Sequence, residues 1–221
     1  VLRAKVKLSD ASEELTVHGV LGSACNSIAG SADLEGAEGR KDAAFAAALP
    51  PADGCARALW IGPAGHPPPA GPTLPPALWD LAAVRSGVAT VTAPVVEAFV
   101  PQMLNYESVD GVSFKKGCYP GQEAVARSQF RGAIKRRAYV GWVDGLVQAG
   151  QDVFASASGA EPVGVIAQAA PAIDPVPGGT AVIAVLRCED AETHGAGLRV
   201  GAAAGPALHA PTMAYPLRDD L

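Results

Sequence analysis

The side chains most able to do chemistry lie close together in the segment FKKGCYPGQEAVAR, residues 114–127. Cys118 follows Lys115 and Lys116 and precedes a proline–glycine turn, and the residues after this turn are typical of a helix with Glu123 in its first turn. Nearby lysines and a helix N-terminus both favour the thiolate form of a cysteine. The pattern therefore predicts a working thiol at Cys118.

The same residues also have a structural interpretation. An isolated cysteine is most often buried and inert, and no histidine is close in sequence to Cys118 to act as its base. Gln122 and Glu123 fit ordinary roles in capping a helix. On spacing alone, both interpretations of Cys118 stay open. A thiol hydrolase is the least favoured function, because the sequence shows no neighbouring pair of a cysteine and a histidine.

The other cysteines and histidines predict no metal site. The four cysteines contain no C-x-x-C pair, and the four histidines are scattered. This spacing argues against the compact zinc motifs and against a disulfide framework. A reducing cytoplasm is the expected compartment.

The charge is unevenly distributed. The protein has a net charge of −5, yet residues 115–137 hold seven of its 17 basic side chains and only one acidic side chain, Glu123. A basic cluster of this kind predicts an anion site. Repulsion from the acidic remainder and an aromatic content of only 5% argue against broad nucleic-acid binding. We therefore expect a local anion pocket.

The first half of the chain predicts a mixture of strands and helices. Period-2 alternation predicts a strand at 14–22, a short helix is expected at 23–30, and an apolar run predicts a strand at 55–62. The alanine-rich residues 40–50, which two prolines follow, are expected to be helical. The proline-rich residues 63–76 are expected to form a surface loop rather than a recognition motif.

The later elements change character near residue 137. Helices are predicted at 77–87, within 95–104 and after the motif turn. Beyond residue 137 the sequence predicts only short strands, RRAYVGWV, DVFAS, PVGVIAQAA and GTAVIAVLR, which are separated by turn residues. This spacing is typical of a small antiparallel barrel or sandwich. We place a domain boundary at residue 137.

The run KGCYPGQE at 116–123, with FVPQMLNYESVD before it and GAIKRRAY after it, resembles the YgfZ family. These are folate-binding proteins related to the T protein (aminomethyltransferase, GcvT) of the glycine cleavage system. The resemblance extends from about Trp79 through Tyr139 and, more loosely, over the rest of the chain. Val1 resembles a position inside the family's first region, so an N-terminal part is expected to be missing.

The resemblance implies an α+β protein. Residues 1–137 would form a partial GcvT-like folate-binding α/β region, and residues 138–221 a C-terminal β-barrel domain. It implies tetrahydrofolate or a folate derivative as the cofactor, Cys118 as the catalytic residue, and a set of cofactor-binding residues: Lys116, Gly117, Tyr119, Gln122, Glu123, Arg127 and Arg137.

The resemblance also implies a role in assembling or repairing iron–sulfur clusters in client enzymes, including enzymes that modify tRNA. One departure concerns a glutamate that holds the pterin in the related aminomethyltransferases, because Arg85 takes its place here. A guanidinium group cannot accept the pterin N–H groups. Arg85 therefore argues against the alternative function, a one-carbon transferase. A module that binds tRNA directly is a third hypothesis. Whether the protein is an enzyme is left open.

Overall fold

The computed structural model describes residues 7–28, 44–155, 161–172, 178–193 and 197–218. The chain divides into two compact units, Val1–Thr73 and Leu74–Leu221. The predicted boundary at residue 137 falls inside the second unit, and a division of family domains at that point stays a prediction. Within the described residues, no helix has the length and apolar character needed to cross a membrane.

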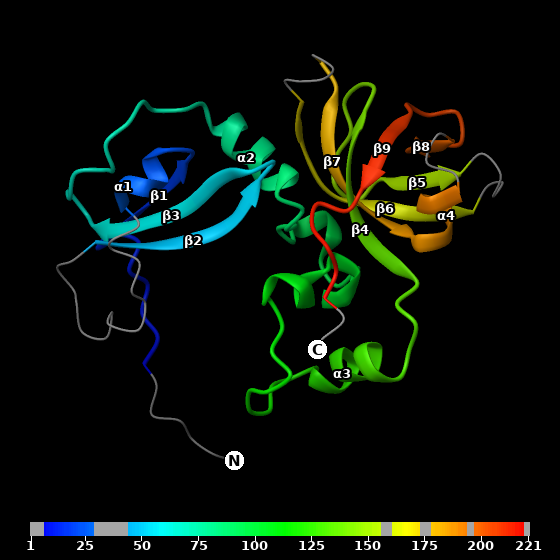
Figure 1. Ribbon diagram of the computed structural model, residues 1–221, viewed down its shortest axis with the longest axis horizontal. Helices are drawn as coiled ribbons and strands as arrows, with labels where there is room; N and C mark the ends of the chain where they lie inside the picture. The colour runs from blue at the N-terminus through cyan, green and yellow to red at the C-terminus, as the bar shows by residue number, and fades with distance from the viewer. Residues whose placement is uncertain (1–6, 29–43, 156–160, 173–177, 194–196, 219–221) are drawn as a thin grey trace. The chain divides into compact units, whose positions relative to one another are not determined.

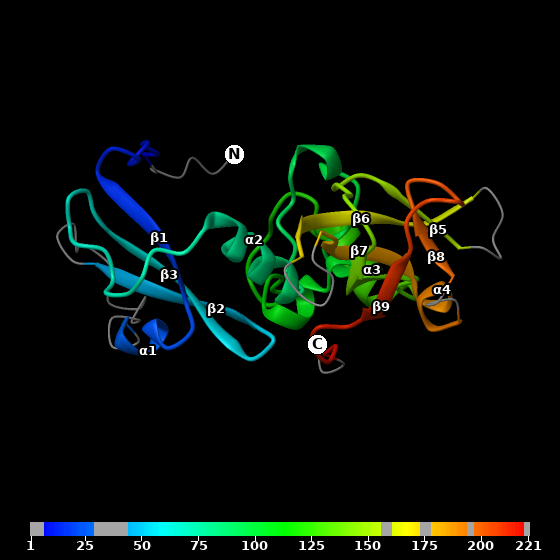
Figure 2. The same cartoon turned by 90° about the horizontal axis from the view of Figure 1, so that it is seen from above.

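The first unit is built on a three-stranded antiparallel sheet in the order β1-β3-β2 (Figure 2). The strands are β1 Leu15–Leu21, β2 Phe45–Ala52 and β3 Cys55–Pro63, and the short helix α1 Ala24–Ile28 follows β1. Val20 pairs with Ala58, and Ala46 pairs with Trp60. These side chains and Ile28 form the buried core of the unit. The predictions of two strands and a short helix are confirmed.

The predicted helix at 40–50 is wrong over its described part, residues 44–50, because Phe45–Ala52 forms β2; residues 40–43 lie outside the described ranges. Alanine favours helices, but only by a few tenths of a kcal/mol per residue. Pairing with β3 buries Ala46 against Trp60 and outweighs that preference. Pro50 and Pro51 lie where the register shifts, on an edge strand that can accommodate residues without N–H donors.

Residues 64–75 form neither helix nor strand, as expected for the proline-rich loop. The second unit then begins with the predicted helix α2, Pro76–Arg85, which ends just before Gly87. Gly87 has a φ of 70°, which suits glycine at a helix end. Three short 3₁₀ turns follow where one short helix was expected: η3 Ala93–Val95, η4 Pro101–Leu104 and η5 Tyr106–Val109.

The rest of the second unit is dominated by a six-stranded antiparallel sheet in the order β8-β5-β6-β7-β4-β9. It curls into a half-barrel (Figure 1). All four predicted strands are present, and two more strands and a short helix were not predicted. The bounds are β4 Arg136–Val143, β5 Asp152–Ala155, β6 Pro162–Pro171, β7 Thr180–Arg187, α4 Cys188–Thr193, β8 Leu198–Val200 and β9 Leu208–Thr212.

Both faces of this sheet are covered. One face holds an apolar core with Val143, Ile166 and Leu186. The other face packs under α2 and the 3₁₀ turns through Leu81, Leu104 and other buried side chains. The half-barrel therefore supports α2 and the 3₁₀ turns that follow it.

Candidate functional site

The turn that carries Cys118 is fastened to the start of helix α3, Gln122–Phe130. Gly121 adopts a φ of 82° at the N-cap, a conformation that glycine takes without a steric cost. The N–H of Tyr119 donates to Oε1 of Gln122 at 3.1 Å, and the N–H of Gln122 approaches the Tyr119 carbonyl at 3.3 Å. These reciprocal bonds fix the turn against the start of the helix.

Two ring contacts stabilise the same turn. Phe114 and Phe130 meet edge to face, with ring centroids 5.3 Å apart, so the residue before the two lysines packs on the last residue of α3. Nζ of Lys116 lies 4.7 Å from the centre of the Tyr119 ring, a cation–π contact. Tyr119 thus contacts both Lys116 and Gln122, and all three are predicted cofactor-binding residues.

In the sequence, Cys118 lies between Lys116 and Tyr119, and it is exposed. The interpretation of Cys118 as a buried thiol is therefore wrong, while its reactivity and catalytic role stay predictions. No heavy atom lies within 4 Å of the place where a side chain at the neighbouring Gly117 would begin. Of the other cysteines, Cys55 is also exposed, and Cys25 and Cys188 are half-buried.

The predicted residues Glu123 and Arg127 form an ion pair on the surface of α3. Their side chains are 2.7 Å apart, four residues from each other, with 84% and 70% exposure. Such an exposed pair contributes at most about 1 kcal/mol to stability. Both groups can therefore exchange this contact for a ligand or for water at little energetic cost.

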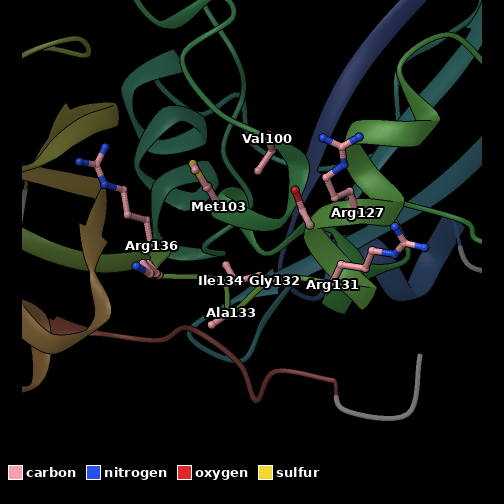
Figure 3. Close-up of a pocket in the computed structure, with 10 residues that line it drawn as sticks. Val100, Met103, Arg127, Arg131, Gly132, Ala133, Ile134 and Arg136 are labelled. Carbon is pink, nitrogen blue, oxygen red and sulfur yellow. The ribbon is translucent and has the colours of Figure 1, made fainter.

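A pocket of about 470 Å³ lies beside α3 (Figure 3). Its lining combines apolar side chains with four cations, Arg127, Arg131, Lys135 and Arg136, and the whole lining consists of Val100, Met103, Arg127, Ser128, Arg131, Gly132, Ala133, Ile134, Lys135 and Arg136. Arg127 and Arg131 lie on one side of the pocket and Arg136 on the other. Four of the basic residues that led us to expect an anion pocket thus line one pocket, and anion binding there stays a prediction.

Gln102 positions one wall of the pocket. Its side chain is fully buried, and its Nε2 donates to the carbonyl of Val125 in α3 at 2.7 Å. This bond joins η4 to α3, so Val100 and Met103 from one segment face residues 131–136 from the other. The pocket is therefore built by a tertiary contact between segments more than 20 residues apart.

Arg137 points to a different place from its basic neighbours. Its Nη1 donates to the carbonyl of Gln102 at 2.9 Å and forms an ion pair with the fully buried Glu107. Asn105 holds the other side of this cluster, since its Nδ2 donates to the carbonyl of Ala138 at 2.9 Å. The structure gives Arg137 a bonding role inside the fold, and its predicted part in cofactor binding stays a prediction.

Three tyrosines surround this buried cluster or lie near it. Burial raises the pKa of Tyr106, whose hydroxyl donates to the carbonyl of Ala89. Burial, with a smaller contribution from Glu107, raises the pKa of Tyr215 to about 12. Burial followed by the neighbouring Cys188 raises the pKa of Tyr139. All three phenols are therefore neutral at physiological pH and serve as donors and packing groups.

The structure brings the predicted residues together only in part. Lys116, Gly117, Cys118, Tyr119 and Gln122 form one turn; Glu123 and Arg127 follow on the helix, and only Arg127 also lines the pocket. Sequence reasoning found the pocket's cations as a charge cluster but missed Val100, Met103 and the buried residues behind them. Polar side chains within the apolar run PQMLNYE were the available signal. Chemically, the site suits a ligand that has both an apolar part and negative charge.

Comparison with known proteins supports one family. The chain is 49% identical over 63 residues to the tRNA-modifying protein YgfZ of Photobacterium profundum, which is 28% of this chain and 19% of that protein. It is 42% identical over 73 residues to that of Aliivibrio fischeri (33% and 22%) and 43% identical over 79 residues to that of Serratia proteamaculans (34% and 23%). The matched stretches span about a fifth of these relatives. No family model matches the chain.

Proposed function

We propose that this chain, whose matches support membership of the YgfZ family, is a folate-binding accessory protein. In this proposal it acts in the cytoplasm and supports the assembly or repair of iron–sulfur clusters in client enzymes. Enzymes that modify tRNA are among these clients, in keeping with the printed name of the relatives. The proposal concerns the whole protein of which the matched stretch is a part.

The pocket beside α3 is the observation that carries the proposal. Tetrahydrofolate joins a flat ring system to a tail that ends in carboxylates. The pocket offers apolar side chains such as Met103 and Ile134 together with four cations. Its volume of about 470 Å³ lies in the range of small-molecule sites, about 300–1,000 Å³.

The donors of the pocket fit the anionic part of such a ligand. Arginine presents planar N–H groups that match a carboxylate in a bidentate pair. Arg131 and Arg136 would hold the carboxylates, and Lys135 would add a point charge. Arg127 would join them once it leaves its exposed contact with Glu123. When bound, tetrahydrofolate supplies a carrier for one-carbon groups.

The turn of Cys118 supplies the second part of the site. Cys118 is exposed on a turn held to α3 by Tyr119 and Gln122, and α3 also provides Arg127 to the pocket. The turn and the short helix that follows it therefore carry a thiol and a cation respectively. In our proposal Cys118 acts on the client's cluster or its sulfur donor, and folate binding sets the conformation of this helix.

Isothermal titration calorimetry with tetrahydrofolate tests the proposal. We expect binding by the chain, and a loss of at least about tenfold in affinity for Arg131→Gln or Arg136→Gln, since each removes a hydrogen bond to a charged group worth about 1.5–3 kcal/mol. Arg199→Gln on β8 removes an equal charge from a residue outside the pocket lining and should leave the affinity unchanged. Equal losses in all three variants would show general attraction only, and no binding would refute the folate site.

The client role needs a separate readout. In cells that lack the endogenous homologue, the activity of an iron–sulfur enzyme that modifies tRNA should fall, and expression of the whole protein should restore it. Cys118→Ala should fail to restore the activity, while Cys188→Ala should succeed. Full restoration by Cys118→Ala would remove the thiol from the mechanism and leave the folate pocket to be judged by the calorimetry.

A further inference from the structure

Two cysteines in the first unit lie against the same turn. Gly22 ends the first strand with a φ of 67°, and its N–H donates to the carbonyl of Ala56 at 2.8 Å, which fastens the turn to β3. Sγ of Cys55 lies 3.9 Å from the place that a Cβ on Gly22 would occupy. The N–H of Cys25 donates to the carbonyl of Gly22 at 3.0 Å.

The two thiols have different surroundings. Cys55 is exposed at the start of β3, while Cys25 is half-buried in α1 and its Sγ contacts the carbonyl of Val20 at 3.4 Å. Burial raises the pKa of the Cys25 thiol, and the nearby Cys55 raises it further. The guanidinium of Arg57 is also within electrostatic reach of Cys55. A thiol that is exposed and near a cation reacts first, and a buried thiol reacts second.

We propose that Cys25 and Cys55 form a reversible disulfide, and that this pair is a site of thiol oxidation separate from Cys118. The sequence spacing predicts no such framework, because 30 positions separate the two cysteines; the sheet brings them to one turn. The inference concerns a different unit from the pocket and does not rest on the proposed function.

The oxidant in this proposal is a small-molecule disulfide such as oxidised glutathione. The Cys55 thiolate attacks one sulfur of that disulfide, which forms a mixed disulfide and releases one glutathione thiolate. Cys25 then loses its proton and attacks the Cys55 sulfur, which closes the protein disulfide and releases the second glutathione. Two protein thiols are oxidised and one glutathione disulfide is reduced, so electrons and atoms balance. Excess reduced glutathione reverses both steps.

Thiol mapping by mass spectrometry tests the pair. The full chain is treated with oxidised glutathione, its free thiols are alkylated, and its peptides are analysed without reduction. We expect a linked Cys25–Cys55 peptide and the loss of alkylation at both residues, with neither linked to Cys118 or Cys188. Dithiothreitol should restore the alkylation.

Single variants identify the order of the two steps. Cys25→Ser should trap glutathione on Cys55, with at least about tenfold more adduct there than in the unsubstituted chain, because the second thiol is absent. Cys55→Ser should leave Cys25 largely unmodified. The proposal is overturned if no linked peptide forms, or if Cys55 in the unsubstituted chain retains as much glutathione as it does in Cys25→Ser.

Discussion

Arg137, the second residue of β4, forms an ion pair with Glu107 in η5, and this pair joins the half-barrel to the turn that follows η4 in the chain. The carboxylate is fully buried, and only 12% of the Arg137 side chain is exposed. Asn105 and the carbonyl of Gln102 accept further bonds from the same guanidinium nitrogen. The pair therefore determines where the segment carrying Val100 and Met103 lies on the sheet.

Arg137→Met should lower the free energy of unfolding by about 3–5 kcal/mol, because it leaves the Glu107 carboxylate buried without its charge partner. Adding Glu107→Leu should recover much of this loss, since it removes the uncompensated charge. Urea unfolding of both variants measures these values. Arg127→Met is the matched control: it breaks an exposed pair and should cost at most about 1 kcal/mol. Equal costs for the two arginines would contradict the structural role of Arg137.

Tyr215 should make stability depend on pH in the alkaline range. Its pKa is raised to about 12 in the fold, against about 10 in an unfolded chain. The neutral phenol thus contributes stability that is fully present below about pH 10 and is lost as the pH rises toward 12. Tyr215→Phe should flatten this part of the curve of unfolding free energy against pH. Some slope should remain, because the pKa values of Tyr106 and Tyr139 are raised as well.

Substitution by alanine should have different effects on stability at two glycines of the second unit. Gly87 has a φ of 70°, and a methyl group there would overlap Ala214 and approach Tyr215 at 3.2 Å. Gly87→Ala should therefore cost about 1–3 kcal/mol. Gly117→Ala has open space and should leave the melting temperature almost unchanged. Thermal unfolding decides between the two, and a strong loss in Gly117→Ala would show that the Cys118 turn is packed more tightly than described.

Iodoacetamide should label the four cysteines in an order that follows their exposure. Cys118 and Cys55 are exposed, so both should react faster than the half-buried Cys25 and Cys188. The neighbouring lysines favour attack at Cys118, so we expect Lys116→Gln to slow the labelling of Cys118 and to leave Cys55 unaffected. Peptide mass spectrometry over a time course gives the four rates. Equal rates at all four positions in the folded protein would show that neither exposure nor charge controls these thiols.

The strands of the half-barrel could be predicted because the local preference of their residues and their burial in the fold both favour a strand. Thr180–Arg187 is rich in β-branched residues, is flanked by turn residues, and forms a central strand that is buried on both faces. The alanine-rich residues 44–50 gave the opposite result. Their local preference is weak, and only the partner strand, which includes Trp60, decides that they become β2.

The sequence predicted which types of residue the candidate site contains, but not how they are arranged in space. The basic cluster at 115–137 predicted an anion pocket, and in the structure four of its cations line a single pocket, whose ligand stays a prediction. The ion pair of Arg137 with Glu107 could not be predicted, because nothing local in the sequence shows that Glu107, 30 residues earlier, is buried beside it. Long-range partners of this kind are set by packing, which no short motif encodes.

The two prolines of β2 limit the length of sheet edge on which another strand could add. β2 is an edge strand, and the free edge of a sheet is a template on which another chain can add a strand. Pro50 and Pro51 offer no N–H groups at the C-terminal end of that edge, so only those N–H groups of Phe45–Leu49 that do not pair with β3 could bond an incoming strand. The residues that were expected to stop a helix would thus shorten the stretch on which an edge-to-edge contact could form.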